Sequence, residues 1–141
     1  MKRVICLVVI LALSACGTTP DTEVPTINTD SIAGYWSGEV VQKLDTRQEL
    51  DPIDIKIIII AGCTAGKVCG KLTEGDHCPG DIVLKKIAGN VYNFLYESVS
   101  GAGHLCGSGD FRMIDLELRS DGTILFVYQN GATITGILQR K

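Results

Sequence analysis

The chain has 141 residues, with 13 Lys and Arg against 16 Asp and Glu, and a formal net charge of −3. This length suits a single domain. The mildly acidic balance argues against nucleic acid as a partner, because phosphate backbones are bound by clustered Lys and Arg.

Residues 1–16 have the organisation of an export signal. Lys2 and Arg3 precede an apolar stretch from Val4 to Leu13, and small residues follow it. A charged start, an apolar middle and a small-residue cleavage site are typical of a secretory signal peptide. A transmembrane helix is one alternative, although the stretch is shorter than the roughly 20 residues that a span needs. An ordinary signal peptide with an incidental cysteine is another.

The end of this signal, Leu13-Ser14-Ala15-Cys16, resembles the lipobox of bacterial lipoproteins. The resemblance implies cleavage before Cys16, a diacylglyceryl group on its thiol and an acylated N-terminus. Gly17 in place of Asp implies, in a diderm host, the outer membrane as the location within the cell envelope. Without residues 1–15 the chain keeps 11 Lys and Arg against 16 acids. We therefore expect membrane attachment to come from the acyl chains alone, without electrostatic docking on anionic lipid.

Cysteine usage agrees with export. Cys6 would leave with the signal and Cys16 would carry lipid, so four cysteines remain: Cys63, Cys69, Cys78 and Cys106. An even number in an exported chain predicts two disulfides, for which three connectivities are open. We favour Cys63–Cys69, which would staple one loop, and Cys78–Cys106, which would join two loops at the same end of the domain.

The composition divides the chain into a signal peptide over 1–15, a lipidated N-terminus with a flexible tether over 16–31, and a β-domain over 32–141. The tether is polar and contains Pro20 and Pro25 without an apolar period, which favours an extended chain. From Ile32 onward, short runs rich in β-branched and aromatic residues alternate with glycine-bearing turns, an all-β pattern. We predict eight strands, at 34–43, 53–61, 67–73, 81–87, 91–98, 110–119, 123–129 and 132–140.

Turn residues predict how the later strands pair. Asn130-Gly131 and Asp121-Gly122 are signals for two-residue hairpins, and Gly89-Asn90 is a third tight connection. The pairing is therefore antiparallel, and alternating apolar residues give each strand one interior face. The run Ile57 to Ile60 is apolar on both faces; we expect a neighbouring element to cover its outer face, with a partner contact as the alternative.

Gly34-Tyr35-Trp36 at the start of the first strand, with Arg140 at the end of the last, is similar to the calycin pattern of lipocalins and avidins. The resemblance implies an eight-stranded antiparallel up-and-down barrel in which Arg140 packs across Trp36. A β-sandwich or a partly open barrel is the alternative fold.

No catalytic motif is present, and we expect no enzymatic activity, cofactor or metal. His77 and His104 flank Cys78 and Cys106, but the spacing fits no common zinc motif and an oxidising compartment favours the disulfide.

We expect a non-catalytic, lipid-anchored envelope protein that binds a small apolar ligand or a protein partner. An envelope protein-inhibitor of the lysozyme-inhibitor type, or a structural lipoprotein, is the alternative. The candidate ligand-binding residues are Trp36, Phe94, Tyr96, Phe126, Tyr128 and Arg140. If side chains fill the interior instead, the loops at 74–80 and 99–109 would carry recognition.

Overall fold

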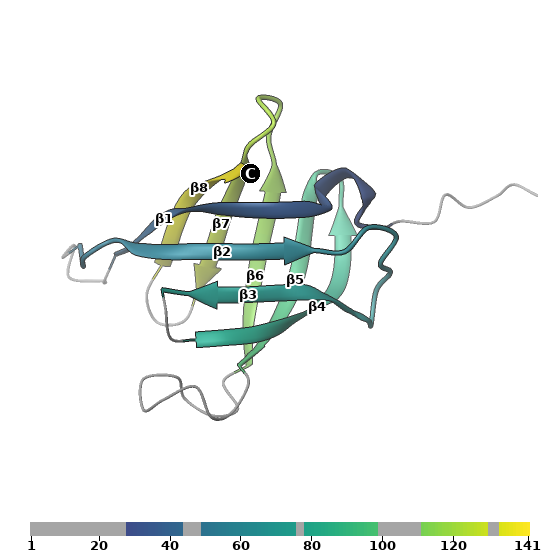
Figure 1. Cartoon of the computed structure of the whole chain (residues 1–141), viewed down its shortest axis with the longest axis horizontal. Helices are drawn as coiled ribbons and strands as arrows, with labels where there is room; N and C mark the ends of the chain where they lie inside the picture. The colour runs from purple at the N-terminus through teal and green to yellow at the C-terminus, as the bar shows by residue number, and fades with distance from the viewer. Residues whose placement is uncertain (1–27, 44–48, 76–77, 99–110, 130–132) are drawn as a thin grey trace, which may run out of the picture.

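The computed structural model describes residues 28–43, 49–75, 78–98, 111–129 and 133–141, with only the backbone described for Cys78, Phe111 and Gln129. These residues form a closed antiparallel barrel in which each strand pairs with the next and β8 returns to β1 (Figure 1). The predicted up-and-down barrel is therefore confirmed, and the sandwich alternative is excluded. No helix in this part of the chain is long and apolar enough to cross a membrane.

A short 3-10 helix, η1 (Asp30–Ile32), precedes the strands. The strands are β1 (Gly34–Lys43), β2 (Ile53–Ile59), β3 (Val68–Glu74), β4 (Cys78–Ala88), β5 (Val91–Ser98), β6 (Phe111–Leu118), β7 (Ile124–Gln129) and β8 (Thr133–Arg140). The predicted bounds differ from these by at most three residues. The folded part begins before residue 32, because Thr29 is already fully buried. The predicted tether is therefore too long at its C-terminal end.

Alternation along the strands builds the core. In β5 the buried side chains are Tyr92, Phe94 and Tyr96, and their neighbours face outward. The same period places Ile124, Phe126 and Tyr128 of β7 inside. Successive residues of a strand point to opposite faces, and a closed sheet has only one interior. The predicted inward faces of these strands are confirmed.

Glycines permit the close approach of β1 and β8 where the barrel closes. A Cβ built on Gly136 would lie 2.3 Å from the carbonyl oxygen of Glu39, and one on Gly38 would lie 2.3 Å from that of Ile137. Both contacts are with backbone, which cannot swing aside as a long side chain can. A larger residue at either position would therefore separate the two strands that close the sheet.

Two of the predicted tight turns fall within the described residues. Ala88 pairs with Val91, so Gly89 and Asn90 form a two-residue connection. The β6–β7 connection is longer than predicted: Gly122 N–H donates to the Arg119 oxygen and Arg119 N–H donates to the Thr123 oxygen. Gly122, with φ +80°, then occupies the left-handed position of a three-residue loop. The predicted Asn130-Gly131 hairpin lies outside the described residues.

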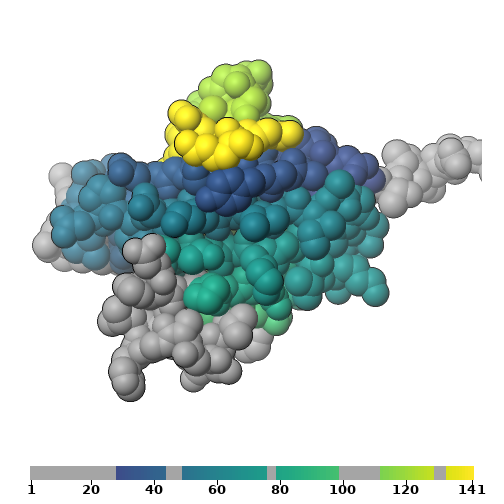
Figure 2. All heavy atoms as spheres, in the orientation of Figure 1, coloured from purple at the N-terminus to yellow at the C-terminus, as the bar shows by residue number. Residues whose placement is uncertain are grey.

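The outer face of the isoleucine run is not covered as predicted. Ile57 and Ile59 are buried, but Ile58 is 54% exposed and Ile60 is 56% exposed. Strand alternation turns these two side chains outward, and no described segment crosses the outer face of β1 to β3 (Figure 2). The alternative, a contact with a partner, therefore remains for this surface.

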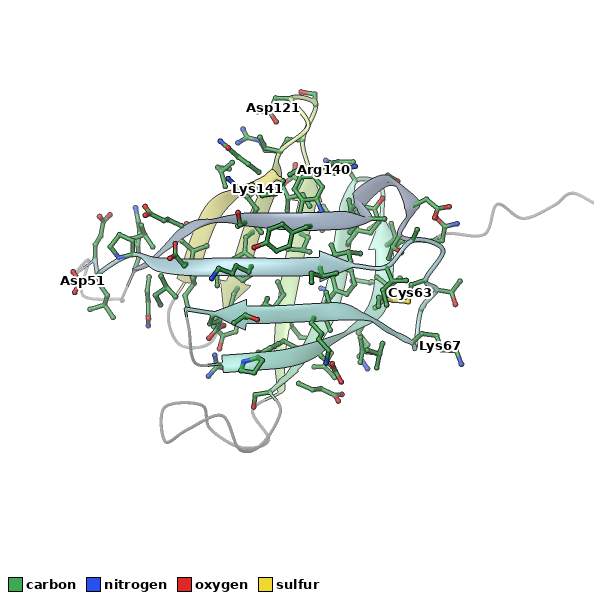
Figure 3. The ribbon with its side chains drawn as sticks, in the orientation of Figure 1. Asp51, Cys63, Lys67, Asp121, Arg140 and Lys141 are labelled. Carbon is green, nitrogen blue, oxygen red and sulfur yellow. A yellow bond between two sulfur atoms is a disulfide. The ribbon has the colours of Figure 1, made fainter. Side chains whose placement is uncertain are left out.

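The barrel has two different ends. We call the end that contains η1, the loop between β2 and β3 and the last residues of β8 the closed end. We call the opposite end, where β3 and β5 finish and β4 and β6 begin, the open end, because no described segment crosses it; residues 44–48, 76–77, 99–110 and 130–132, which join strands at this end, lie outside the described part of the chain. In Figure 3, Cys63 and Lys67 mark the closed end and Asp51 lies at the opposite extreme of the view.

Candidate functional site

Trp36 and Arg140 meet at the closed end. Their Cα atoms are partners in the β1–β8 ladder, and the Arg140 guanidinium carbon lies 4.6 Å from the centroid of the indole ring. Trp36 Nε1 donates a hydrogen bond of 2.8 Å to the Ile32 oxygen, and Arg140 donates one of 3.1 Å to the Ser31 oxygen. The two side chains thus hold η1 across this end of the barrel. The expected packing of Arg140 on Trp36 is present.

The loop between β2 and β3 is tied to the segment that precedes η1. Thr29 N–H donates to the Cys63 oxygen, and Cys63 N–H donates to the Thr29 hydroxyl. The same hydroxyl also donates to the Ile60 oxygen. A disulfide joins Cys63 to Cys69 across the same loop, as predicted. Closing a loop of this size stabilises a fold by about 2 kcal/mol in the chain-entropy model. The closed end is therefore held by side chains, backbone bonds and a covalent link.

The candidate ligand-binding aromatics pack inside the barrel. Trp36, Phe94, Tyr96 and Phe126 are at most 1% exposed, and Tyr128 is 5% exposed. Side chains of this volume occupy the centre of the domain, so the interior at these positions is packed. Arg140, at the closed end of the barrel, is exposed. Five of the six predicted residues thus share one interior, with Tyr96 and Tyr128 nearest the open end.

Glu74 and Arg112 form an ion pair beside these two tyrosines. Arg112 Nη1 lies 3.3 Å from Glu74 Oε2, and the two side chains are only 23% and 19% exposed. The Arg112 guanidinium carbon lies 5.4 Å from the centroid of the Tyr128 ring. We call Glu74, Tyr96, Arg112 and Tyr128 the mouth cluster. It places a cation, an anion and two aromatic rings at the inner rim of the open end.

Burial controls the proton equilibria of the mouth cluster. Desolvation raises the pKa of Glu74, while the nearby Arg112 charge acts in the opposite direction. Desolvation and the charge of Glu74 raise the pKa of Tyr96 to about 12, so its phenol keeps its proton at neutral pH. The partly exposed Arg112 and Glu74 side chains are the polar groups that the cluster presents to solvent at the mouth.

Glu74 and Arg112 were not among the site residues predicted from the sequence. The signal was present in the strand period, because Arg112 lies two residues before Ile114 and Glu74 two residues after Leu72. Leu72 and Ile114 are buried, so the same alternation, continued toward the open end of β3 and β6, places Glu74 and Arg112 on the inward face. What the period alone does not reveal is that the two strands bring these charges together.

Several predicted features lie outside the described residues. They include the lipidation site Cys16, the disulfide cysteine Cys106 and the histidines His77 and His104. Cys78 begins β4, but its side chain is not described, so the Cys78–Cys106 disulfide stays a prediction. Within the part of the chain that the structure describes, no group of three His, Cys, Asp or Glu side chains could hold a metal ion.

A shallow hollow of about 510 Å³ lies on the outside of the barrel, over β1, β2 and β8. Its lining includes Tyr35, Ser37, Glu39, Lys56 and Gln139. The hollow is polar and opens widely to solvent, and it is separated from the mouth cluster by the barrel wall.

Comparison of this chain with protein-family models, with curated proteins and with solved structures gives no match.

Proposed function

We propose that this protein is a non-catalytic lipoprotein of the bacterial cell envelope, anchored through Cys16, whose barrel binds a partner at its open end. In a diderm host its location is the outer membrane. The observation that carries the proposal is the difference between the two ends of the barrel. One end is sealed by η1, Trp36, Arg140 and a disulfide, whereas the other presents the mouth cluster.

The packed interior favours a protein partner. Phe94 and Phe126 leave at most 1% of their surface exposed, so recognition falls to the rim and the segments that connect the strands there. A partly buried ion pair flanked by aromatic rings resembles the centre of many protein interfaces, where Arg and Tyr are enriched. An envelope inhibitor of a cell-wall hydrolase is one form that such a partner relationship takes.

A small apolar ligand is the second candidate. It is favoured by the closed eight-stranded barrel, an architecture that can hold one small ligand at its mouth. Such a ligand would reach the mouth cluster at the partly exposed Arg112 side chain, because the Tyr96 and Tyr128 rings are at most 5% exposed. Native mass spectrometry of the detergent-extracted protein tests this version: a retained small molecule supports it, and a mass equal to that of the lipidated chain alone contradicts it.

Anchoring is tested by metabolic fatty-acid labelling of the native protein and of Cys16→Ala. We expect label in the native protein and none in the variant. Fractionation of membranes from the same cells locates the protein. Label that persists in Cys16→Ala would overturn the anchoring proposal.

Recognition at the open end is tested by placing one photo-reactive residue at Asp51 or at Asp121. Both positions are exposed acids: Asp51 lies just before β2 at the open end, and Asp121 lies between β6 and β7, where β6 ends at the other end of the barrel. We expect a discrete cross-linked product from position 51 in living cells and none from position 121. Equal products from the two positions, or a product from 121 alone, would contradict the proposal.

A further inference from the structure

An exposed apolar surface lies beside the point where the tether enters the barrel. Tyr35 is 37% exposed, Ile58 54%, Ile60 56% and Val68 52%. We call these four residues the apolar patch. Tyr35 and Ile58 are cross-strand partners, Ile60 lies on the same face two residues farther on, and its N–H donates to the Cys69 oxygen next to Val68. The four residues therefore occupy neighbouring positions on the outer face of β1 to β3, with Lys71 opposite Ile58.

The patch is fixed to the start of the folded chain. The Thr29 hydroxyl donates to the Ile60 oxygen, and Thr29 N–H donates to the Cys63 oxygen 3.2 Å away. Asp30 Oδ1 accepts a hydrogen bond of 2.6 Å from Gly62 N–H. Residues 17–27 connect this point to Cys16. A chain of that length spans about 40 Å at most, so a bilayer that holds Cys16 stays within reach of the patch.

Three lysines border the patch. Lys67 precedes Val68, and its backbone oxygen accepts a hydrogen bond of 3.1 Å from Leu84 N–H, which brings Lys85 and Lys86 to the same edge. All three side chains are exposed, and none forms an ion pair with a side chain that the structure describes. The acids around this edge have other partners: Asp30 accepts from Gly62 N–H, Asp81 pairs with Lys71, and Asp115 accepts from Asn93, the cross-strand partner of Lys86.

We propose that the apolar patch and these three lysines lie against the surface of the bilayer that holds the anchor, so that the open end points away from it. The inference depends on the proposed lipid anchor at Cys16. Apolar side chains enter the interfacial region while lysines remain at the lipid phosphates. The net negative charge of the chain does not prevent this, because the fold gathers cations at one edge. A tether also keeps the local lipid concentration high, so that weak contacts suffice.

The test uses the full-length lipidated protein in nanodiscs of phosphatidylethanolamine and phosphatidylglycerol that contain a gadolinium-chelating lipid. Isoleucine methyl groups are labelled, and their paramagnetic relaxation is measured by NMR. We expect the methyls of Ile58 and Ile60 to relax several-fold faster than that of Ile137, an isoleucine with 38% exposure on the outer face of β8. Equal relaxation of the three methyls would overturn the inference.

Two variants sharpen the test. Lys67→Glu with Lys85→Glu and Lys86→Glu is expected to remove most of the difference between Ile60 and Ile137, whereas Lys43→Glu at the open end leaves it unchanged. Thermal unfolding by circular dichroism verifies that both variants are folded. A triple variant that keeps the full difference would contradict the role of the lysines. Resonances of the patch that instead shift with protein concentration would assign it to self-association and overturn the membrane contact.

Intact mass separates this inference from the proposed function. A lipidated mass with equal relaxation of Ile58, Ile60 and Ile137 rejects the membrane contact and leaves the anchor in place. A mass without acyl chains rejects the anchor, and the inference fails with it because its tether would no longer end in a bilayer.

Discussion

Arg140 connects three parts of the closed end through one guanidinium group. It lies over the Trp36 ring and donates to the Ser31 oxygen, while the Trp36 indole donates to the next residue, Ile32. A cation over an indole contributes about 0.5–2 kcal/mol, and a hydrogen bond from a charged donor adds a similar amount. The last strand therefore stabilises a helix that precedes the first strand.

Removing this side chain should weaken the closed end. We expect Arg140→Ala to lower the free energy of unfolding by about 1–2 kcal/mol and to change the fluorescence of Trp36, because both interactions are lost. Urea denaturation followed by tryptophan emission measures the effect. Lys141→Ala removes the neighbouring exposed cation and is the control. Equal stability of the two variants would argue against a structural role for the stacked pair.

Glu74 links stability to pH. Burial raises its pKa above 4.5, so the folded state binds this proton more tightly than the unfolded state does. Its contribution therefore favours folding below the unfolded pKa and is lost as the pH rises through the folded pKa. We expect the native protein to lose stability relative to Glu74→Gln as the pH rises above 4.5.

Urea denaturation at several pH values measures this difference, with Glu49→Gln as the control for loss of an exposed carboxylate. A gap between native protein and Glu74→Gln that stays constant with pH would show that Arg112 cancels the effect of burial at this site. A gap that grows in favour of the native protein as pH rises would show that Arg112 outweighs burial.

Among the elements, β1 and β8 make the contact that closes the sheet. Their approach requires residues without side chains at Gly38 and Gly136, where a Cβ would lie within 2.3 Å of a carbonyl oxygen of the facing strand. Other glycines serve the turns: Gly75 has φ +57° and open space around its Cβ position. Two different physical reasons thus select glycine in the same barrel.

The two reasons give different costs. We expect Gly136→Ala to destabilise the protein by about 2–3 kcal/mol, because the backbone of β1 must move. Gly75→Ala should cost about 1 kcal/mol, which reflects only the left-handed backbone. Chemical denaturation of both variants provides the comparison. A smaller cost at Gly136 than at Gly75 would contradict the close approach seen in the structure.

At the scale of the whole molecule, the barrel has no free strand edge because β8 pairs with β1. Every other pairing joins neighbours in sequence, whereas this one joins the two ends of the domain. An open sheet would expose two rows of unpaired backbone groups and the aromatic interior. The stability of the domain therefore depends on its last strand more than the length of that strand suggests.

Truncation tests this dependence. We expect removal of residues 133–141 to abolish cooperative unfolding and soluble monomer, because β1 and β7 are left as edges and the core is opened. Removal of Lys141 alone, which leaves β8 intact, is the control. Thermal denaturation and size-exclusion chromatography distinguish the two chains. A truncated chain that remains monomeric and unfolds cooperatively would show that closure is not required.

The candidate site was accessible to sequence reasoning only in part. Alternation was enough to place Phe94, Tyr96, Phe126 and Tyr128 on inward faces, because a strand period is a local property. Glu74 and Arg112 follow the same period, but they are 38 residues apart, and their pairing depends on where β3 and β6 finish and begin around the barrel. The exposure of Ile58 and Ile60 could not be predicted from the sequence either, because it depends on whether another described segment packs on that face of the sheet.

The amino-acid sequence by itself determined the all-β class, the approximate strand bounds, the Cys63–Cys69 link and the meeting of Trp36 with Arg140. The first two follow from short-range patterns of polarity and turn residues. Cysteine spacing favoured the Cys63–Cys69 link among three open connectivities, and the meeting of Trp36 with Arg140 was implied by the resemblance to calycins. Only the tertiary structure decided that the sheet closes, that one end is sealed and that an apolar patch, three lysines and the entering chain share an edge. Such features depend on barrel closure and strand stagger, which bring together residues that no local pattern connects.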